Sequence, residues 1–433
     1  MDDFIPIKPL TAPPKATIEL PGSKSITNRA LLCAALASGT TEIRGALFAD
    51  DTEAMLDAIA CLGSDVSTDP AAKQITIEGL DGTIKPKPKT MIDARMSGTT
   101  SRFLVAVAAT TAIPITIDGH LQLRSRPFSD IVDALRSLSV VVDTAPHNSL
   151  PLRVQGPLRS GQVTVSVDRS SQFLSGLMLA APLVPGGLIF HLDTTPVSRP
   201  YIEMTAQVMR AFAAEVEIGQ NSIRVAGGGY KSPGDYVVEP DASAASYFWA
   251  AAAITGGSIQ LANLYMNSIQ GDIAFASVLK KMGASVMTNA CNSSSQQNIT
   301  VTGGHLRGIN VGLTDLSDTV PTLAVVAAFA EGSTTVEGVG FIRDKESDRI
   351  TASVEELRRC GVAAYEHVDG FTVSPTPGQC PTGARINTYN DHRMAMAFSV
   401  LGLVVPGIEI ENPGCVAKTF PDFFSTLEKL YIE

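Results

Sequence analysis

The alternation of apolar and polar positions predicts a strand and then a helix near the start of the chain. The strand-like run 16–20 is broken by Pro and Gly at 21–22. From 30 to 37 the residues are apolar in a helical pattern, which Gly39 ends. The loop between them is made of small residues and carries Lys24 at the start of the predicted helix. A lysine beside the N–H groups of a helix start indicates either a solvated polar cap or an anion site.

The same order of elements recurs at six places along the chain, although the second and sixth copies are less regular. A small polar cluster opens each unit and leads into an Ala- and Leu-rich helix, a Gly or Pro turn and a β-branched strand. A second helix with a Leu and Met stripe follows, and then one or two closing strands. Ordinary alternation of helices and strands does not explain why this order holds six times. The pattern predicts an α/β (α+β) fold of six βαβαββ-like units, three in each of two domains.

The polar cluster occupies the same place in every unit, the N-terminus of the first helix. Capping explains the Ser, Thr and Asp residues found there, but it does not explain the cations near these openings. If three such helices pack round an axis, their N-termini converge on one face of a domain. Two such faces opposed to each other would make a cleft for a ligand with several negative charges. The openings are 24–25, 97–99, 170–172, 241–243, 317–319 and 391–393, and the cations are Lys24, Arg29, Arg102, Arg126, Lys345, Arg349, Arg393 and Lys418.

Length and composition narrow the class of protein. A chain of 433 residues is too long for one ordinary core, and a break between two domains is predicted near 239–241, after a glycine-rich loop. The net charge of −10 argues against a nucleic-acid partner, so an anionic ligand must be met by local clusters of Lys and Arg. The acidic N-terminus lacks a signal-like run, and the apolar stretches near 103–117 and 247–254 are too short or interrupted to span a bilayer.

The cysteines and two carboxylates complete the candidate chemistry. The cysteines at 33, 61, 291, 360, 380 and 415 show no CxxC or zinc spacing, which indicates reduced thiols in a cytoplasmic protein. Asp318 opens a predicted helix, and Glu346 lies between Lys345 and Arg349; alone they would be a helix cap and a solvated salt bridge. A carboxylate near several cations is also what proton transfer at an anionic substrate needs. His392 is interpreted as an accessory residue.

Ordered motifs along essentially the whole chain resemble the enolpyruvyl transferase family, and within it the branch that acts on shikimate 3-phosphate. They are PGSKSITNR (21–29), SGTTSR (97–102), SRP (125–127), SSQF (170–173), VSRPYI (197–202), DASAASYF (241–248), NSIQGD (267–272), DKESDR (344–349), NDHRMAM (390–396) and AKTFPDFF (417–424).

The resemblance implies a fold and a reaction. The fold is two domains of three βαβαββ repeats each, an inside-out α/β barrel, with domain bounds of 22–240 and of 1–21 with 241–433 and two hinge crossings between them. The reaction transfers the enolpyruvyl group of phosphoenolpyruvate to the 5-hydroxyl of shikimate 3-phosphate and releases phosphate, on the route to chorismate and the aromatic amino acids. It implies small-molecule substrates, no cofactor, no metal, no nucleic acid and no membrane, and a cytoplasmic monomer that is a glyphosate target.

The resemblance also implies roles for individual residues. Asp318 would take the proton of the 5-hydroxyl, and Glu346, with Lys24, would handle the proton at the phosphoenolpyruvate methylene. Shikimate 3-phosphate would contact Lys24, Ser25, Arg29, Ser170, Ser171, Gln172, Ser198, Asp318 and Lys345. Phosphoenolpyruvate would contact Lys24, Gly98, Arg126, Gln172, Arg349, Arg393 and Lys418.

The chain departs from the family pattern in three places. Met96 and Phe341 stand where many members have Asn, which affects the expected inhibitor response and removes one substrate contact, respectively. The segment ending at 102–103 is Arg-Phe where some members have Arg-Pro.

Two other functions remain open. The related UDP-N-acetylglucosamine enolpyruvyl transferases often carry a reactive Cys where this chain has Leu121, and the segment 391–396 favours the shikimate branch. A non-catalytic phosphoanion-binding paralogue is the second alternative, and the intact set Lys24, Asp318, Glu346 and Arg393 argues against it.

Overall fold

Within the described residues, five four-stranded sheets repeat one strand order, as the sequence pattern predicted, and a three-stranded sheet has part of it. In the first, β16 (Asp235–Val237) runs parallel to β4 (Thr40–Arg44), and β6 (Gln74–Glu78) lies antiparallel between β4 and β5 (Asp65–Asp69). The second and third sheets have the orders β7-β8-β10-β9 and β11-β12-β14-β13, and β15 pairs separately with β3. These strands are β3 (Ala37–Ser38), β7 (Met91–Asp93), β8 (Ile115–Asp118), β9 (Val141–Ala145), β10 (Ser149–Gln155), β11 (Gly161–Val165), β12 (Leu188–Leu192), β13 (Val216–Ile218), β14 (Ser222–Val225) and β15 (Tyr230–Lys231).

The other three sheets follow the same plan, the last of them with three strands, and two of them draw on the beginning of the chain. Their orders are β18-β19-β17-β2, β20-β21-β23-β22 and β1-β25-β24. The N-terminal strands β1 and β2 therefore complete sheets whose other strands come from the second half of the chain. The strands are β1 (Phe4–Ile7), β2 (Lys15–Ile18), β17 (Ser258–Tyr265), β18 (Ser285–Cys291), β19 (Ser293–Thr302), β20 (Asn310–Gly312), β21 (Thr334–Glu337), β22 (Ala364–His367), β23 (Gly370–Val373), β24 (Arg385–Ile386) and β25 (Ile408–Glu411).

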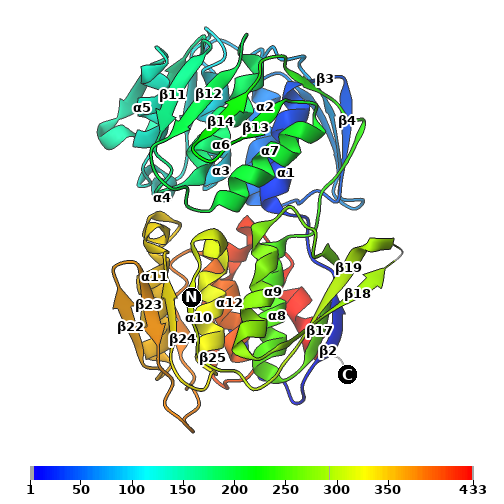
Figure 1. Cartoon of the computed structure of the whole chain (residues 1–433), viewed down its shortest axis with the longest axis vertical. Coiled ribbons are helices and arrows are strands. Elements are labelled where there is room, and N and C mark those ends of the chain that lie inside the picture. Colours follow the sequence, from blue (N-terminus) through cyan, green and yellow to red (C-terminus); the bar gives the residue numbers. More distant parts are fainter. Residues whose placement is uncertain (1–3, 292, 432–433) are drawn as a thin grey trace. The chain divides into compact units, whose positions relative to one another are not determined.

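The first helix of each repeat, here called an inner helix, is buried on nearly all sides. Such helices are apolar all round, so they have no polar face to present to water and must lie inside. In Figure 1, α8, α10 and α12 run side by side, and the three pack against one another. The inner helices are α1 (Lys24–Leu36), α3 (Gly98–Ala108), α6 (Ser171–Ala180), α8 (Ala242–Thr255), α10 (Val320–Ala327) and α12 (His392–Gly402).

The remaining helices are shorter or bury only one face. In α11, for example, Ile350, Val354 and Leu357 are buried, whereas Arg358 and Arg359 are exposed. The α-helices of this group are α2 (Asp50–Cys61), α4 (Leu121–Arg124), α5 (Ser129–Ser137), α7 (Arg199–Ala211), α9 (Phe275–Met282), α11 (Arg349–Arg359) and α13 (Phe423–Glu428). The 3-10 helices are η1 (Pro146–Asn148), η2 (Ala181–Leu183), η3 (Gly271–Ala274), η4 (Thr314–Thr319), η5 (Gly340–Asp344), η6 (Pro413–Lys418) and η7 (Lys429–Tyr431).

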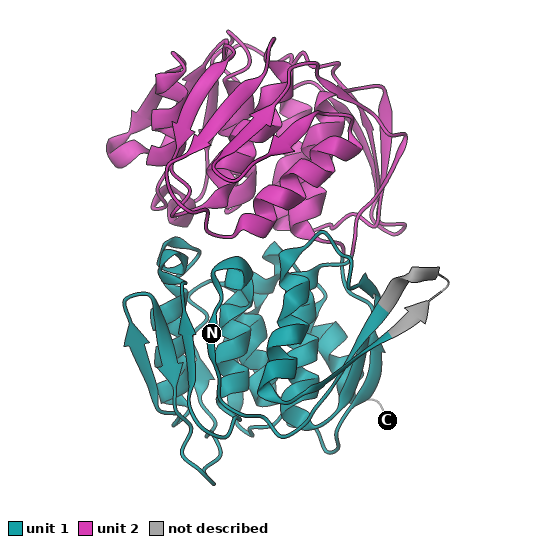
Figure 2. Ribbon diagram, viewed as in Figure 1, with its two compact units in different colours: residues 1–21, 240–433 teal, residues 22–239 magenta. Residues whose placement is uncertain are grey.

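The chain divides into two compact units, coloured in Figure 2. Unit 1 comprises Met1–Pro21 and Pro240–Glu433, and unit 2 comprises Gly22–Glu239. The computed structural model describes residues 4–291 and 293–431, without the side chains of 289–297. The acidic residues 1–3 and the thiol of Cys291, both used in the sequence interpretation, lie outside this description. None of the described helices has the length and apolar character that a bilayer crossing requires.

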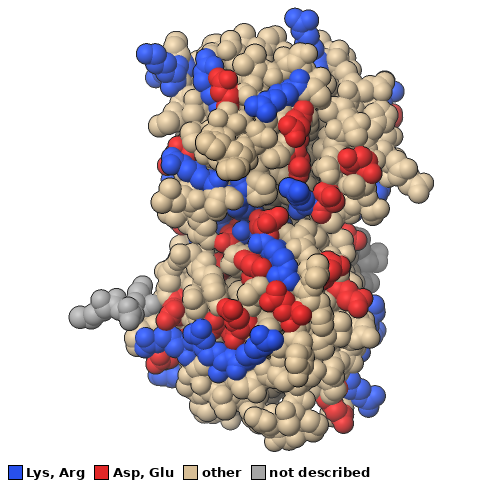
Figure 3. Space-filling view, turned by 90° about the vertical axis from the view of Figure 1, so that its left-hand side faces the viewer, with Lys and Arg blue, Asp and Glu red and all other residues tan. Residues whose placement is uncertain are grey.

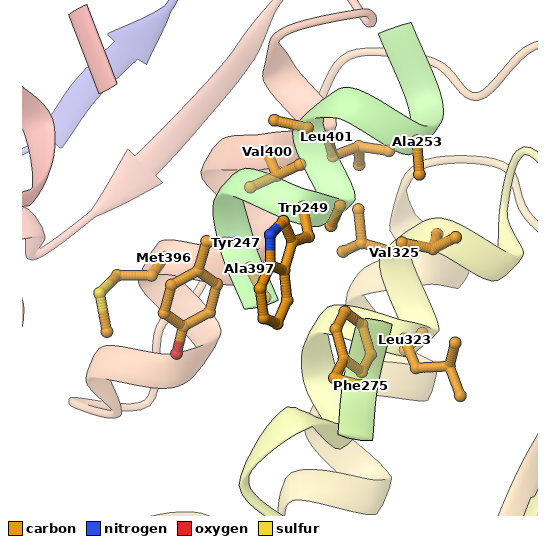
Figure 4. Packing of buried hydrophobic residues seen from close by; sticks show 14 of the residues in the cluster. Tyr247, Trp249, Ala253, Phe275, Leu323, Val325, Met396, Ala397, Val400 and Leu401 are labelled. Carbon is orange, nitrogen blue, oxygen red and sulfur yellow. The ribbon is translucent and has the colours of Figure 1, made fainter. Parts of the chain in front are cut away.

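The core of unit 1 surrounds the single tryptophan of the chain. Trp249 on α8 is fully buried, and Figure 4 shows it beside Phe275 of α9, with Val325 of α10 and Val400 of α12 close by. Trp249 and Phe275 belong to one repeat, and Val325 and Val400 belong to two others. Packing at this point therefore holds the repeats of unit 1 together.

Phe275→Ala should destabilise unit 1 by about 3–5 kcal/mol, because it leaves a cavity in a closely packed core. Urea denaturation followed by the emission of Trp249 measures this directly. The control is Val368→Ala, at a position 90% exposed, which should change the free energy of unfolding by no more than about 0.5 kcal/mol. Equal stability of the two variants would contradict this account of the core.

Candidate active site

The polar clusters lie at the N-termini of the inner helices, as predicted, and most of them act as caps. Ser23, Ser97, Ser170, Asp241 and Asp391 each accept a backbone N–H of the following helix. The exception is α10, whose start has no side-chain cap. The alternative in which Asp318 is only a helix cap does not hold, since this residue lies in η4, immediately before α10.

In unit 1 the carboxylate of Asp318 is held by two arginines. Nη1 of Arg349 donates to Oδ1 at 3.0 Å, and Nη2 of Arg393 donates to Oδ2 at 2.6 Å. Arg349 begins α11, whereas Arg393 lies in the first turn of α12. Arg393 also donates to the hydroxyl of Tyr247 on α8, at 3.3 Å. Arg393 thus links the start of α12 to α8 and to the segment that precedes α10.

Asp391 fixes both of these arginines, and it has no exposed surface. Its carboxylate accepts from Nε of Arg349 at 2.8 Å and from Nη2 at 3.2 Å, while Oδ1 also caps the N–H of Arg393 at 2.9 Å. Burial acts to lower the pKa of Arg349, but the charges of Asp391, Glu346 and Asp318 outweigh it and raise the pKa above its usual value. The sequence placed Asp391 in a capping cluster and did not reveal its second role.

Glu346 also belongs to this group of charges. The alternative of a solvated salt bridge on a helix does not hold for Glu346. Residues 345–348 lie between η5 and α11, and its side chain is only 11% exposed. Its carboxylate lies 2.9 Å from Nη2 of Arg349 and 3.7 Å from Nζ of Lys418. We call Asp318, Glu346, Arg349, Asp391, Arg393 and Lys418 the unit 1 charge cluster.

Lys345, the other cation of this segment, lies over an aromatic ring. Its Nζ is 5.8 Å from the centroid of Phe341, at a distance suited to a cation–π interaction. Phe341, one of the departures from the family pattern, is thus an aromatic neighbour of Lys345.

In unit 2, Lys24 begins α1 and forms an ion pair with Asp51 of α2. The Nζ to Oδ2 distance is 3.3 Å, and Asp51 is buried. Asp51 had no signal in the sequence beyond an acidic helix start, so its pairing with Lys24 is known only from the tertiary structure. The neighbouring Ser25 uses its carbonyl to accept from Nη1 of Arg29, at 2.8 Å.

Arg29 is buried among neutral acceptors. It donates to Oγ1 of Thr205 at 2.7 Å and to the carbonyls of Ser25 and Tyr201, and its guanidinium lies 5.0 Å from the ring centroid of Phe103. Within the described residues no carboxylate contacts it. Burial lowers the pKa of Arg29 to about 10. A buried cation that lacks a protein counter-charge favours an anion nearby.

Gln172, at the start of α6, is held by Arg102. Nη1 of Arg102 donates to Oε1 of Gln172 at 2.6 Å, and the guanidinium lies 4.7 Å from the ring of Phe173 and 5.7 Å from that of Phe128. The sequence identified Arg102 only as a cation near a helix start, and the structure shows that it binds the side chain of Gln172. Ser170 caps the N–H of Gln172 at 3.2 Å.

The other residues expected in the site lie at helix starts of unit 2. Gly98 begins α3, and a Cβ added there would come within 2.7 Å of Nη1 of Arg126, so Arg126 passes close to this helix start. Ser171 begins α6 and Ser198 precedes α7, and both are buried. The backbone of Ser198 is left-handed, with φ of 53°, and its side chain does not cap the helix.

Thiols and metal ligands do not form a second site in the described part of the chain. Cys33, Cys61, Cys360, Cys380 and Cys415 are free, and burial raises the pKa of Cys33, Cys360 and Cys415 to about 12. Among these residues no group of three or more His, Cys, Asp or Glu is placed to hold a metal ion.

On the face drawn in Figure 3, basic side chains lie among acidic ones.

The fold is that of the enolpyruvyl transferases. A solved structure of EPSP synthase from Acinetobacter baumannii matches with a TM-score of 0.83 and 28% identity, covering 99% of this chain and 98% of that one. An enolpyruvyl transferase from Streptomyces tendae shares the fold at 17% identity, with a TM-score of 0.79 and coverage of 99% and 97%. The fold class predicted from the repeats is confirmed by these likenesses.

The family is shown by the sequence comparisons. The family model for EPSP synthase (3-phosphoshikimate 1-carboxyvinyltransferase) matches residues 10–427. A 3-phosphoshikimate 1-carboxyvinyltransferase from Nostoc punctiforme is 42% identical over 428 residues, 98% of each chain, and one from Cronobacter sakazakii is 41% identical over 434 residues, 99% of each. The chain belongs to the EPSP synthase family of enzymes.

Asp391→Ala should destabilise unit 1 by about 3–5 kcal/mol, because it leaves the buried guanidinium of Arg349 without its main counter-charge. Denaturation followed by Trp249 emission measures the change. The matched control is Glu409→Ala, which removes the carboxylate of the exposed Arg385–Glu409 pair, also in unit 1 and also at 3.0 Å or less between its nearest atoms. That pair should contribute about 0–1 kcal/mol. Similar losses in the two variants would mean that Asp391 does not hold a buried charge.

Proposed function

We propose that the chain transfers the enolpyruvyl group of phosphoenolpyruvate to the 5-hydroxyl of shikimate 3-phosphate. The products are 5-enolpyruvylshikimate 3-phosphate and phosphate. The reaction is an intermediate step of the shikimate pathway. Membership of the EPSP synthase family gives the reaction. The observation that carries the assignment of residues is the unit 1 charge cluster, in which a carboxylate is held by two arginines.

The cations of the charge cluster suit the acidic groups of phosphoenolpyruvate. Arg349 and Arg393 have planar guanidinium groups that can bind carboxylate or phosphate through two hydrogen bonds, and Lys418 adds a further positive charge. These cations now contact Asp318 and Glu346. An anionic substrate would compete for the same guanidinium groups. Binding of the substrate would therefore weaken the hydrogen bonds from Arg349 and Arg393 to Asp318 and leave that carboxylate able to accept a proton.

The two carboxylates can divide the proton transfers. Asp318 would take the proton of the 5-hydroxyl while that oxygen bonds to C2 of phosphoenolpyruvate, and Glu346, with Lys24, would supply a proton to C3. The resulting tetrahedral intermediate carries a methyl group and the phosphate. Loss of phosphate from C2 and return of one methyl proton to Glu346 then restore the double bond. The cations would stabilise the charge that develops on the departing phosphate.

Unit 2 supplies groups suited to holding the substrates. Arg29 is a buried cation whose protein partners are neutral, which favours a substrate anion beside it. By the proposal it acts with Lys24, Ser25 and the α6 start, Ser170 to Gln172, together with Ser198 of unit 2 and Lys345 of unit 1, on shikimate 3-phosphate. Arg126 and the start of α3 at Gly98 would contact phosphoenolpyruvate, as would Lys24 and Gln172.

A single assay separates this function from the two alternatives. Phosphate release should require both phosphoenolpyruvate and shikimate 3-phosphate, and UDP-N-acetylglucosamine should not replace the latter. Release with the UDP-sugar instead would identify the related transferase activity. Binding of both anions without phosphate release would identify a non-catalytic paralogue.

Asp318→Asn should lower turnover by roughly 10²–10⁴-fold, the usual contribution of a general base, because an amide cannot accept the proton. Shikimate 3-phosphate should still bind, since Asn keeps the size of the side chain. The measurement is kcat together with a dissociation constant for shikimate 3-phosphate from calorimetry. Glu428→Gln, at an exposed position of α13, is the control and should leave both unchanged. Equal losses of binding and turnover in Asp318→Asn would favour a positional role.

Gly98→Ala should raise KM for phosphoenolpyruvate by about tenfold, or about 1.4 kcal/mol, because the new methyl group must displace the end of Arg126. Inhibition by glyphosate, a longer anion that the resemblance places in the same position, should weaken by a larger factor. Gly161→Ala is the control, because its Cβ would meet only Leu138, at an ordinary 3.5 Å. The test measures both constants in the three proteins. Equal factors for substrate and inhibitor would show that Gly98 does not bound this end of the ligand.

We also propose that the enzyme is a cytoplasmic monomer. The support is its family of biosynthetic enzymes and the absence, among the described helices, of one that could cross a bilayer. Light scattering on the purified chain should give a mass near 45.5 kDa.

A further inference from the structure

Residues 387–391, here called the α12 turn, end at Asp391 and lead directly into α12, which carries Arg393. Two successive residues of this turn, Tyr389 and Asn390, have left-handed backbones, with φ of 54° and 55°. Such a backbone is unfavourable for a residue with a side chain, and most of all for a bulky one such as tyrosine. It persists only where the surrounding contacts fix it.

The contacts that fix the α12 turn come from α11. The hydroxyl of Tyr389 lies 2.9 Å from Oε1 of Glu356 and 2.8 Å from Oε2 of Glu355, so it can donate to either carboxylate. Oε2 of Glu356 accepts the N–H of Asn387 at 3.1 Å, and Oδ1 of Asn387 accepts the N–H of Tyr389 at 2.8 Å. Glu356 therefore holds the turn at two points.

Glu356 has no exposed surface and no role in the proposed reaction. A buried carboxylate is costly unless hydrogen bonds or a counter-charge satisfy it. Arg359 of the same helix lies 3.5 Å away, but its side chain is 49% exposed. The other donors that contact Glu356 within the described residues, Tyr389 and Asn387, belong to the α12 turn. The buried carboxylate and the turn thus satisfy each other.

The α12 turn is also joined to the start of α11. Its last residue, Asp391, accepts from Nε of Arg349, the first residue of α11, at 2.8 Å, and it caps the N–H of Arg393 at 2.9 Å. The helix α11 therefore contacts the turn twice, through Arg349 at its start and through Glu356 further along. A shift of the turn would move the carboxylate that orients both arginines.

The short helix η6 contacts the same turn. Nδ2 of Asn412 donates to Oδ1 of Asn390, and Asn412 immediately precedes η6, which ends at Lys418. The α12 turn is thus bonded to α11, leads into α12 and is bonded to the start of η6. These three elements carry Arg349, Arg393 and Lys418, the cations of the unit 1 charge cluster.

We propose that Tyr389 is a positioning residue for the binding of phosphoenolpyruvate. Through Glu356 it keeps the α12 turn in its left-handed conformation, and the turn sets the relative positions of Arg349, Arg393 and Lys418. This inference rests on the proposed function, in which these cations bind phosphoenolpyruvate. Tyr389 acts through its neighbours and not by contact with the substrate.

Tyr389→Phe removes the hydroxyl and keeps the ring, so it tests the contact with α11. KM for phosphoenolpyruvate should rise about tenfold, because a shifted turn displaces Asp391 and the two guanidinium groups that it orients. The dissociation constant for shikimate 3-phosphate, measured by calorimetry, should not change, since most of its proposed contacts come from unit 2. The matched control is Tyr365→Phe, which removes a hydroxyl from β22 of unit 1 at a position 54% exposed and should leave both constants unchanged.

Glu356→Gln changes the other partner of the contact. The carboxylate uses one oxygen for Tyr389 and the other for Asn387, whereas an amide has only one oxygen that accepts. KM for phosphoenolpyruvate should therefore rise in this variant as well. In the double variant with Tyr389→Phe, KM should rise by less than the product of the two single factors, because both changes break one contact.

A second readout does not depend on activity. Urea denaturation followed by the emission of Trp249 compares Tyr389→Phe, Asp391→Ala and the variant with both changes. The double variant should lose less stability than the two single variants together, because each change undoes the same arrangement of the turn. The same curves show that a variant is folded under the conditions of the kinetic assay.

Three results would overturn the inference. The first is an unchanged KM for phosphoenolpyruvate in folded Tyr389→Phe. The second is an equal loss of affinity for both substrates, which would show that the hydroxyl only supports the fold. The third is additive losses in the stability cycle, which would show that the turn does not hold Asp391. A wild-type protein that releases no phosphate would instead refute the proposed function, and this result is distinguishable because it involves no variant.

Discussion

The structure depends on inner helices that are buried all round. An apolar helix with no solvent face leaves its first N–H groups without water, so each start must be satisfied by side chains or by a ligand. Ser23, Ser97 and Ser170 do this in unit 2, and Asp241 and Asp391 do it in unit 1. The requirement gathers polar residues at one end of otherwise apolar elements. The cations that we propose to serve the chemistry are placed among them.

The two units meet the cost of buried charge in different ways. In unit 1 the cations Arg349, Arg393 and Lys418 face carboxylates of the protein, so most of their charge is balanced within the fold. In unit 2 the acceptors that the buried guanidinium of Arg29 contacts among the described residues are neutral, and burial lowers its pKa. The first arrangement suits groups that exchange protons and partners during a reaction. The second suits a fixed site for an anionic group of the substrate.

Several side chains that organise the site have no proposed role in the reaction itself. Asp391 holds one arginine with its carboxylate and caps the backbone of another, while Arg102 holds Gln172 between aromatic rings. Such residues act by fixing the position and charge of their neighbours, which is how a preorganised site stabilises a transition state without reorganising.

The sequence by itself determined the repeat, the apolar inner helices, their polar starts and the set of nearby cations, because these features arise from neighbours a few residues apart. It also indicated Lys24, Asp318 and Glu346, through motifs. Only the tertiary structure decided their partners. Asp318 is joined to Arg393, 75 residues away, and Lys24 to Asp51, and no local pattern encodes which charges meet across packed elements. For the same reason the sequence left a helix cap and a surface salt bridge open as alternatives for Asp318 and Glu346. The burial of these two residues depends on packing between elements, which periodicity along one helix does not contain.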